Sequence, residues 1–189
     1  AVLLAVMMVC SNISIPSKAA ETVQTIAAWE YKDKDSAPSS LPAGATSGSG
    51  QLNVTGATYT GYSSKSLAAN NWEEEGSWTI SEINAEKYEN LTFSASLRSS
   101  NTGAKNFQLE YSLDKGQSWM VVAGGAVEIT STNLTQLYKD VKLPAELSGK
   151  NFTLRVKKVG TTSVNGGTVA LTGASNINHI VIKGTTTED

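Results

Sequence analysis

The chain has 189 residues, of which 40% are hydrophobic and 17% are charged, and its formal net charge is -2 at pH 7. This balance lacks the strong positive charge with which proteins attract nucleic-acid phosphates, so we expect no nucleic-acid partner for this segment. The length predicts one domain with a sizeable core.

The first twenty residues are typical of an export signal. Residues 1–10 are an apolar run, and residues 17–20 (SKAA) resemble a cleavage site. A transmembrane helix needs about 20 apolar residues, twice the length of this run. We therefore interpret residues 1–20 as a signal peptide remnant and expect a secreted or cell-surface protein with no membrane attachment after cleavage.

The cysteine content indicates which class of organism the protein comes from. The single cysteine, Cys10, lies within the signal-like segment, so the exported part would contain no disulfide. Exported eukaryotic domains of this size often contain disulfides, and their absence favours a Gram-positive bacterium. A lipid-modified Cys10 is the alternative, although Val9 stands where lipidation requires a small residue.

From residue 21 onward, short runs of alternating apolar and polar residues are separated by turn-forming clusters, which predicts strands rather than helices. We predict strands at residues 22–31, 51–56, 57–62, 77–83, 88–100, 105–112, 119–123, 126–131, 134–144, 151–159, 168–173 and 177–184. So many short strands predict an all-β, two-sheet antiparallel β-sandwich. We favour a jelly-roll-like topology, because immunoglobulin-like domains have only about 100 residues.

Three further features concern the organisation of this sandwich. The first and last strands are both hydrophobic and are expected to pair centrally. Residues 51–56 and 57–62 are expected to pair around Gly56. Residues 32–50, rich in Pro, Gly, Ser and Ala, form a predicted loop longer than the roughly 12–15 residues usual in compact domains, which favours a functional or flexible segment. The module is expected to span residues 21–185, with residues 186–189 beginning a linker.

Residues 105–123 predict one β-hairpin. Phe107, Leu109 and Tyr111 alternate with polar residues, and a turn at residues 114–116 joins the arms. The turn resembles the Asp-box hairpin, S-x-D-x-G-x-S/T-W, through Ser112, Asp114, Gly116, Ser118 and Trp119. That motif is known as a repeat in sialidase propellers, where it is a folding device. A single copy argues against a propeller.

Catalytic and metal-binding motifs are sparse. His179 is the only histidine, which excludes the usual His/Cys zinc sites in the exported part. The sequence has no G-x-S-x-G elbow, P-loop or G-x-G-x-x-G motif. We therefore expect a non-enzymatic segment. An enzyme that uses paired carboxylates among Glu73–Glu75, Glu82 and Glu110 remains the third alternative.

A structural calcium ion is the one metal that the sequence suggests. Glu30 near the end of the first strand and Asn178 in the last strand offer hard oxygen ligands, with Asp33 and Asp35 close by. A solvated acidic loop is the alternative.

The polar face of the central strands is the expected ligand site. If their apolar residues fill the core, the opposite face presents Arg98, Gln108, Glu110 and Arg155, with Trp72 as an aromatic ring at the rim. Carboxylate, amide and guanidinium groups bind sugar hydroxyls, while a flat ring stacks on the sugar. An ordinary cross-strand ladder is the alternative for the polar groups, and Tyr62 is the alternative ring. The other three tryptophans, Trp29, Trp78 and Trp119, are expected in the core.

The chain as a whole resembles β-sandwich accessory modules of secreted Gram-positive multidomain proteins, often N-terminal to phosphoesterase or nuclease domains. The resemblance depends on AAWEY (27–31), the block at residues 97–119, Leu143–Pro144, NGGT (165–168) and NINHIVIKG (176–184). It implies a non-catalytic module that binds a polysaccharide, cell-wall polymer or cell-surface glycan. The alternative is a structural spacer that packs on a downstream domain of the same chain. Asn178–His179 stands where the resemblance leads us to expect Asp-Asn.

Overall fold

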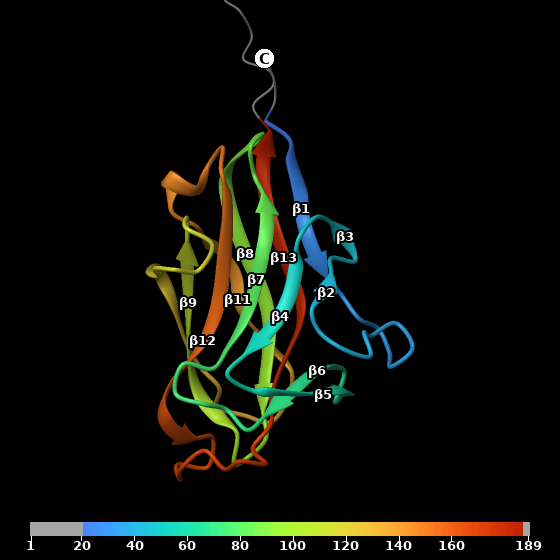
Figure 1. The fold of residues 1–189 in the computed structure, drawn as a ribbon, viewed down its shortest axis with the longest axis vertical. Coiled ribbons are helices and arrows are strands. Elements are labelled where there is room, and N and C mark those ends of the chain that lie inside the picture. The colour runs from blue at the N-terminus through green and yellow to red at the C-terminus, as the bar shows by residue number, and fades with distance from the viewer. Residues whose placement is uncertain (1–20, 187–189) are drawn as a thin grey trace, which may run out of the picture.

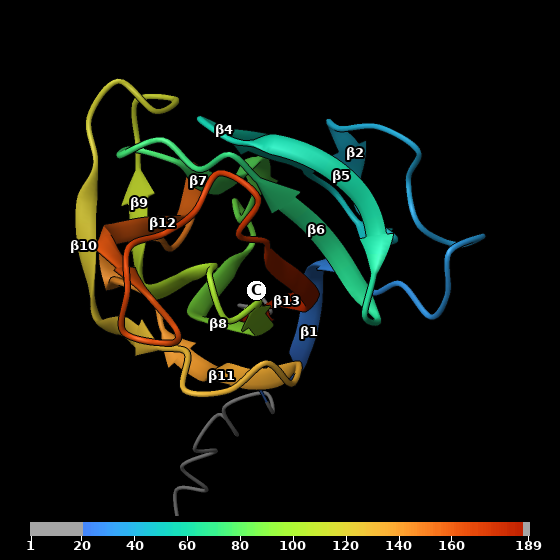
Figure 2. The same cartoon turned by 90° about the horizontal axis from the view of Figure 1, so that it is seen from below.

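A computed structural model describes residues 21–186, so the predicted signal segment and most of the predicted linker lie outside the described residues. Two antiparallel sheets pack face to face; in Figure 1 one sheet lies in front of the other, and Figure 2 shows the sandwich from below, along its strands. The predicted β-sandwich is confirmed. Within residues 21–186 there is no helix with the length and hydrophobicity that a membrane span requires.

We call the first layer sheet A. Its seven strands are β1 (Val23–Trp29), β3 (Ser47–Gly48), β5 (Thr58–Ser63), β6 (Ser66–Asn70), β8 (Tyr88–Ser99), β11 (Thr135–Lys142) and β13 (Ser175–Thr186). Strand β13 pairs with β1 on one side and with β8 on the other, which confirms the predicted central pairing of the first and last strands.

We call the second layer sheet B. Its six strands, in spatial order, are β10 (Met120–Glu128), β9 (Ala104–Ser112), β12 (Asn151–Ser163), β7 (Ser77–Asn84), β4 (Gln51–Thr55) and β2 (Ala43–Gly44). A short 3₁₀ helix, η1 (Ala145–Leu147), precedes β12. From β7 to β13 the chain passes repeatedly from one sheet to the other, as in a jelly roll.

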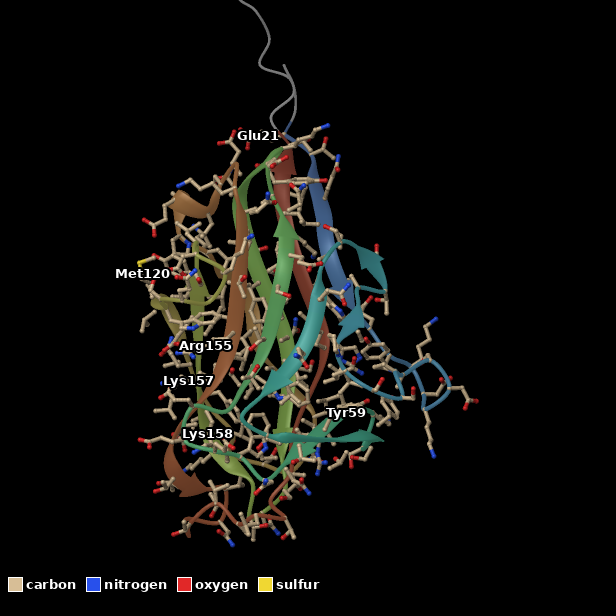
Figure 3. The ribbon with its side chains drawn as sticks, viewed as in Figure 1. Glu21, Tyr59, Met120, Arg155, Lys157 and Lys158 are labelled. Carbon is tan, nitrogen blue, oxygen red and sulfur yellow. The ribbon has the colours of Figure 1, made fainter. Side chains whose placement is uncertain are left out.

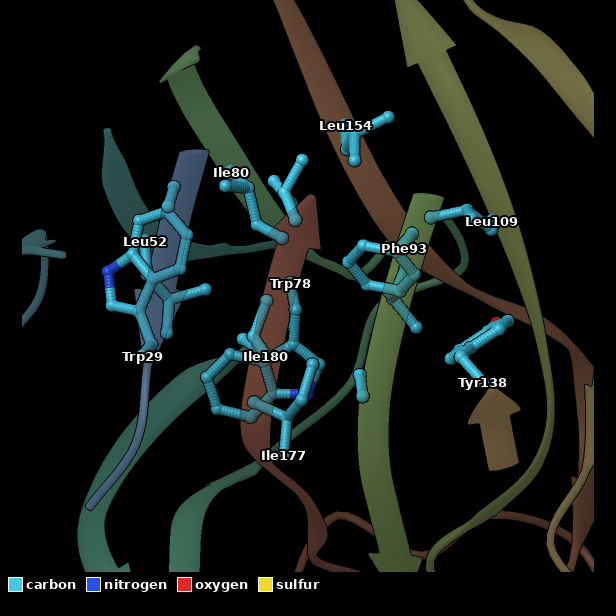
Figure 4. Close-up of a cluster of buried hydrophobic side chains, with 14 of the residues drawn as sticks. Trp29, Leu52, Trp78, Ile80, Phe93, Leu109, Tyr138, Leu154, Ile177 and Ile180 are labelled. Atoms are coloured by element: carbon cyan, nitrogen blue, oxygen red, sulfur yellow. The ribbon is translucent and has the colours of Figure 1, made fainter. Parts of the chain in front are cut away.

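The core lies between the two sheets. Inward-pointing residues of the longer strands are fully buried, among them Leu109 and Leu154 of sheet B and Phe93 and Ile180 of sheet A (Figure 4). Alternation with a period of two is what buries one face of each sheet and leaves the other for polar side chains.

Two strand predictions are wrong. Residues 51–56 and 57–62 do not pair around Gly56, because β4 pairs with β7 in sheet B and β5 pairs with β6 in sheet A. Residues 168–173 form no strand; they contribute only an isolated bridge between Thr162 and Thr168. Both errors concern long-range pairing, which local alternation does not encode.

The long loop of residues 32–50 is ordered against β1. It contains the two-residue strands β2 and β3 and a cis peptide bond between Leu41 and Pro42. The amide of Thr46 donates to the carbonyl of Ala28 at 2.7 Å, and the amide of Ser49 donates to the carbonyl of Ile26 at 3.3 Å. The loop therefore has a defined position beside β1 of sheet A, while its strand β2 pairs with β4 at the edge of sheet B.

Candidate functional site

A groove of about 810 Å³ lies on the outer face of sheet B. Its floor is formed by Thr79 and Ser81 of β7 with Phe152 and Thr153 of β12. The β9–β10 loop forms one wall, with Leu113, Lys115, Gly116 and Trp119. The opposite end is lined by Ser49, Glu82, Asn84 and Asn151. Hydroxyls and amides therefore line much of the hollow, and of its two aromatic residues Phe152 is buried whereas Trp119 is partly exposed.

The wall of the groove is the loop that resembles an Asp-box. The hydroxyl of Ser112 donates to Asp114 Oδ1 at 2.7 Å and accepts from the amide of Gly116 at 2.7 Å. The other carboxylate oxygen of Asp114 accepts from the hydroxyl of Ser118 at 2.5 Å. Lys115 and Gly116 both have positive φ, which glycine adopts without strain. These bonds fix the loop and, with it, the ring that follows.

Trp119 lies on the outer face of sheet B and is partly exposed, so its predicted place in the core is wrong. The reason is the register of the hairpin. Met120 pairs with Tyr111, and Val121 pairs with Glu110, which directs positions 119 and 121 outward with Glu110. A shift of one residue in register exchanges the two faces of a strand, and the register here depends on the loop geometry rather than on local alternation.

Arg155 supports the ring from beneath. Its guanidinium carbon lies 4.3 Å from the centroid of the Trp119 ring, a cation–π contact. The same guanidinium donates from Nε to Glu110 Oε2 at 2.6 Å and ion-pairs through Nη2 with that oxygen. The side chains of Arg155 and Glu110 are only 13% and 12% exposed. The pair is therefore largely shielded from solvent and forms a fixed support for the Trp119 ring. Figure 3 shows where Arg155 lies on β12.

Glu75 extends the charge network. Its carboxylate lies 2.6 Å from Lys157 Nζ and 3.6 Å from Arg155 Nη2, and the hydrogen bond from Lys157 lowers the pKa of Glu75. Residues 73–75 are all exposed, as expected of a solvated acidic run. Glu75 additionally pairs with two of the cations of β12, a contact between distant segments that the sequence does not reveal.

A β-bulge shapes the far end of the groove. Phe152 pairs with Ile83 and Leu154 with Ile80, so Ser81 and Glu82 together oppose one residue of β12. Glu82 adopts a positive φ of 58° at this point and is exposed. Bulges re-aim side chains and are frequent beside functional sites. Here the bulge places a carboxylate at the groove.

The chain is similar to solved carbohydrate-binding modules of family 29. For a module from Piromyces equi the TM-score is 0.49 at 10% identity, covering 88% of this chain and 92% of that chain. For a variant complexed with mannohexaose the TM-score is 0.47 at 10% identity, covering 89% and 94%. For a variant complexed with cellulohexaose it is 0.47 at 13% identity, covering 89% and 93%. These similarities assign no residue a role in this chain.

The sequence comparisons give no family. No protein-family model matches the chain, and no curated protein matches it. The candidate binding site is therefore defined by the groove on sheet B and the residues that line it.

None of the five residues predicted to bind a ligand is among those that line the groove. Trp72 was expected to be an exposed ring, but it is 9% exposed and packs edge-on against Trp78 and Phe107. Its Nε1 donates to the carbonyl of Ala69 at 2.9 Å. The residue lies just beyond β6, where alternation along a strand no longer predicts which way a side chain points.

Arg98 belongs to the other layer. Strand β8 lies in sheet A, and Arg98 Nε donates to the carbonyl of Thr132 at 2.6 Å. The predicted grouping of Arg98 with Glu110 and Arg155 is therefore wrong, because the chain crosses between sheets in the turn from β8 to β9. Gln108 does share the outer face of sheet B, but its side-chain Nε2 donates a hydrogen bond to the carbonyl of Leu109 at 2.8 Å.

Glu30 and Asn178, the two residues suggested to bind calcium, are poorly suited to hold a cation. Asn178 Oδ1 accepts from the amides of Tyr31 and His179, and its Nδ2 donates to the carbonyls of Tyr31 and Lys65. An amide oxygen with two donors has no lone pair left for a metal. Among residues 21–186, no group of three or more His, Cys, Asp or Glu side chains is arranged to hold an ion, and Glu30 is exposed.

Asp114 gives the loop a pH-dependent stability. Hydrogen bonds from Ser118 and Ser112 hold the pKa of Asp114 well below its usual range. A carboxyl with a depressed folded-state pKa stabilises the fold above its unfolded-state pKa of about 3.9, and this stabilisation is lost as the pH falls towards the folded-state value. We expect Asp114→Asn to lower the Tm at neutral pH, with the difference from the unchanged protein narrowing below about pH 4.

Thermal unfolding followed by circular dichroism from about pH 7 to about pH 2 measures this difference. Asp35→Asn, in the exposed part of the loop of residues 32–50, is the control and should shift the Tm little. A Tm difference for Asp114→Asn that stays constant over the whole range would contradict the role given to the carboxylate.

Proposed function

We propose that residues 21–186 form a non-catalytic module that binds a polysaccharide in the groove on sheet B. The observation that supports this most strongly is Trp119, a partly exposed ring held over Arg155 beside a groove of hydroxyl and amide side chains. A sugar ring has an apolar face of C–H groups and a rim of hydroxyls. A fixed aromatic ring suits the face, and the neighbouring hydroxyls and amides suit the rim.

The small number of carboxylates in the groove favours binding over hydrolysis. Glycosidases cleave with two carboxyl groups about 5–10 Å apart. Among the described residues that line the groove, Glu82 is the one carboxylate, and Glu110 is held outside that lining in its pair with Arg155. This arrangement supports a module that holds the chain without cutting it.

The proposed setting is an exported multidomain protein of a Gram-positive bacterium. The apolar run of residues 1–10, the cleavage-like residues 17–20 and the absence of cysteine after Cys10 support export. In that setting the module would hold a downstream domain, such as a phosphoesterase or nuclease, close to an extracellular polysaccharide or cell-wall polymer.

Retention of the purified chain on polysaccharide gels tests the proposal. Native electrophoresis through gels containing glucomannan, galactomannan, xylan or hydroxyethylcellulose should show slowed migration with at least one polymer, while albumin migrates unchanged. The same polymers should release no reducing sugar on prolonged incubation. Unchanged migration in all four gels, or steady release of reducing ends, would contradict the proposal.

A structural spacer is the second candidate. It is favoured by apolar side chains at the edge strand β10, where Val121 is 62% exposed and Met120 is 40% exposed. Exposed apolar patches of this kind are found where domains pack together. A spacer would migrate unchanged in every gel, so the same experiment separates the two candidates.

A further inference from the structure

We propose that the groove continues past its far end into a second hollow, so that the module binds an extended polysaccharide chain with one aromatic platform at each end, Trp119 and Tyr88. This inference rests on the proposed function and deepens it, because it specifies an internal stretch of a long chain as the ligand.

The two hollows share their boundary. The second hollow has a volume of about 340 Å³, and both hollows are lined by Ser49 and Asn84. A ligand that fills the groove to its far end therefore already touches residues of the second hollow. About 340 Å³ is near the lower limit of small-molecule sites, which suits the addition of a short piece of chain rather than a separate large ligand.

The junction between the hollows is polar and tied in place. The side chain of Asn151, which lines the groove, donates to Glu86 Oε1 at 3.2 Å, and Glu86 lines the second hollow. The amide of Glu86 in turn donates to Asn84 Oδ1 at 3.0 Å. Hydrogen-bonding groups thus follow the path from one hollow to the next, as a hydroxylated chain requires.

Ser49 is held at the junction by its neighbour Gly48. The φ of Gly48 is +77°, and an added Cβ would lie 1.9 Å from the carbonyl oxygen of Ile26. Only glycine fits such an approach. The loop of residues 32–50, whose length predicts a functional or flexible segment, thus contributes a fixed wall to both hollows.

Tyr88 closes the second hollow. The ring is partly exposed, and its hydroxyl donates to Gln24 Oε1 at 3.4 Å. Its backbone is anchored, because its amide donates to the carbonyl of Ala85 and its carbonyl accepts from the amide of Gly149. Gly184 packs against it so closely that an added Cβ would lie 2.9 Å from Tyr88 Cβ. The ring is therefore a positioned apolar surface beside polar groups, as at Trp119.

The experiment measures affinity against chain length by isothermal titration calorimetry. The probes are the manno- and cello-oligosaccharide series from trisaccharide to hexasaccharide. Tyr88→Ala should weaken binding of the hexasaccharide roughly fivefold and leave the trisaccharide unchanged, because only the longer chain spans both rings. Tyr88→Phe keeps the ring and should bind like the unchanged protein.

Thr25→Leu provides a second variant that leaves the core intact, since Thr25 is exposed and lines the second hollow but not the groove. A larger side chain there should also reduce hexasaccharide affinity and spare the trisaccharide. Equal effects of both variants at all chain lengths, or no effect at any length, would overturn the inference while leaving the groove at Trp119 as the binding site. Absence of binding by both series would overturn the proposed function and this inference together.

Discussion

Replacement of Trp119 by alanine is expected to weaken polysaccharide binding by at least about 2 kcal/mol, roughly 30-fold in Kd, as for a central aromatic hot spot. Trp119 is the large ring that lines the groove, and Arg155 fixes it from one side. Affinity electrophoresis and calorimetry with the retained polysaccharide measure the loss. The fold should survive, because the ring lies outside the core.

Trp119→Phe is the matched control. It keeps a smaller ring over Arg155 and should retain part of the affinity, whereas Trp119→Ala should retain almost none. Both variants should unfold within a few degrees of the unchanged protein, since substitutions at exposed positions usually alter stability by about 0.5 kcal/mol or less. Undiminished binding by Trp119→Ala would exclude the ring as the platform.

The second large effect concerns stability. Trp78 is fully buried between the sheets, and its ring lies 5.8 Å from that of Trp72. Removal of such a side chain leaves a cavity and costs about 3–5 kcal/mol. For a domain of this size each kcal/mol lowers the Tm by about 2–4 °C, so Trp78→Ala should unfold roughly 6–20 °C earlier. Differential scanning calorimetry measures the shift.

Trp78→Phe refines this prediction. The indole nitrogen of Trp78 is buried and has no hydrogen-bond partner, so phenylalanine removes an unpaired polar group while it loses only part of the volume. We expect less than half of the Tm loss of Trp78→Ala. Binding measured well below the Tm should be unchanged in both variants. A Tm shift below about 3 °C for Trp78→Ala would contradict the assigned packing.

The fold was predictable because alternation is a local property. The inward-facing residues Phe107, Leu109 and Tyr111 of β9 were identified correctly, since a sandwich buries one face of a strand whichever sheet contains it. The β9–β10 hairpin was predicted because its turn chemistry lies within a few residues. Pairing of β4 with β7 and of β5 with β6 depends on contacts between distant segments, and the prediction failed there.

The site was harder to predict for the same physical reason. Arg98 and Arg155 both lie on polar faces, but a polar face does not identify its sheet, and the two residues lie on different layers. Trp72 and Trp119 exchanged their expected roles because each lies just outside a strand, where loop geometry determines the direction of the side chain. The one available signal for the groove was the Asp-box-like turn, whose hydrogen bonds place its final tryptophan.

The tryptophan indole signals in a ¹H–¹⁵N correlation spectrum test the central claim most directly. The chain has four tryptophans, of which Trp29, Trp72 and Trp78 are buried and Trp119 lies at the groove. Titration with mannohexaose, cellulohexaose and xylohexaose should shift the Trp119 indole signal with at least one sugar and leave the three buried indoles nearly unmoved. Shifts confined to residues of sheet A, or no Trp119 shift at millimolar sugar, would contradict a polysaccharide site on sheet B.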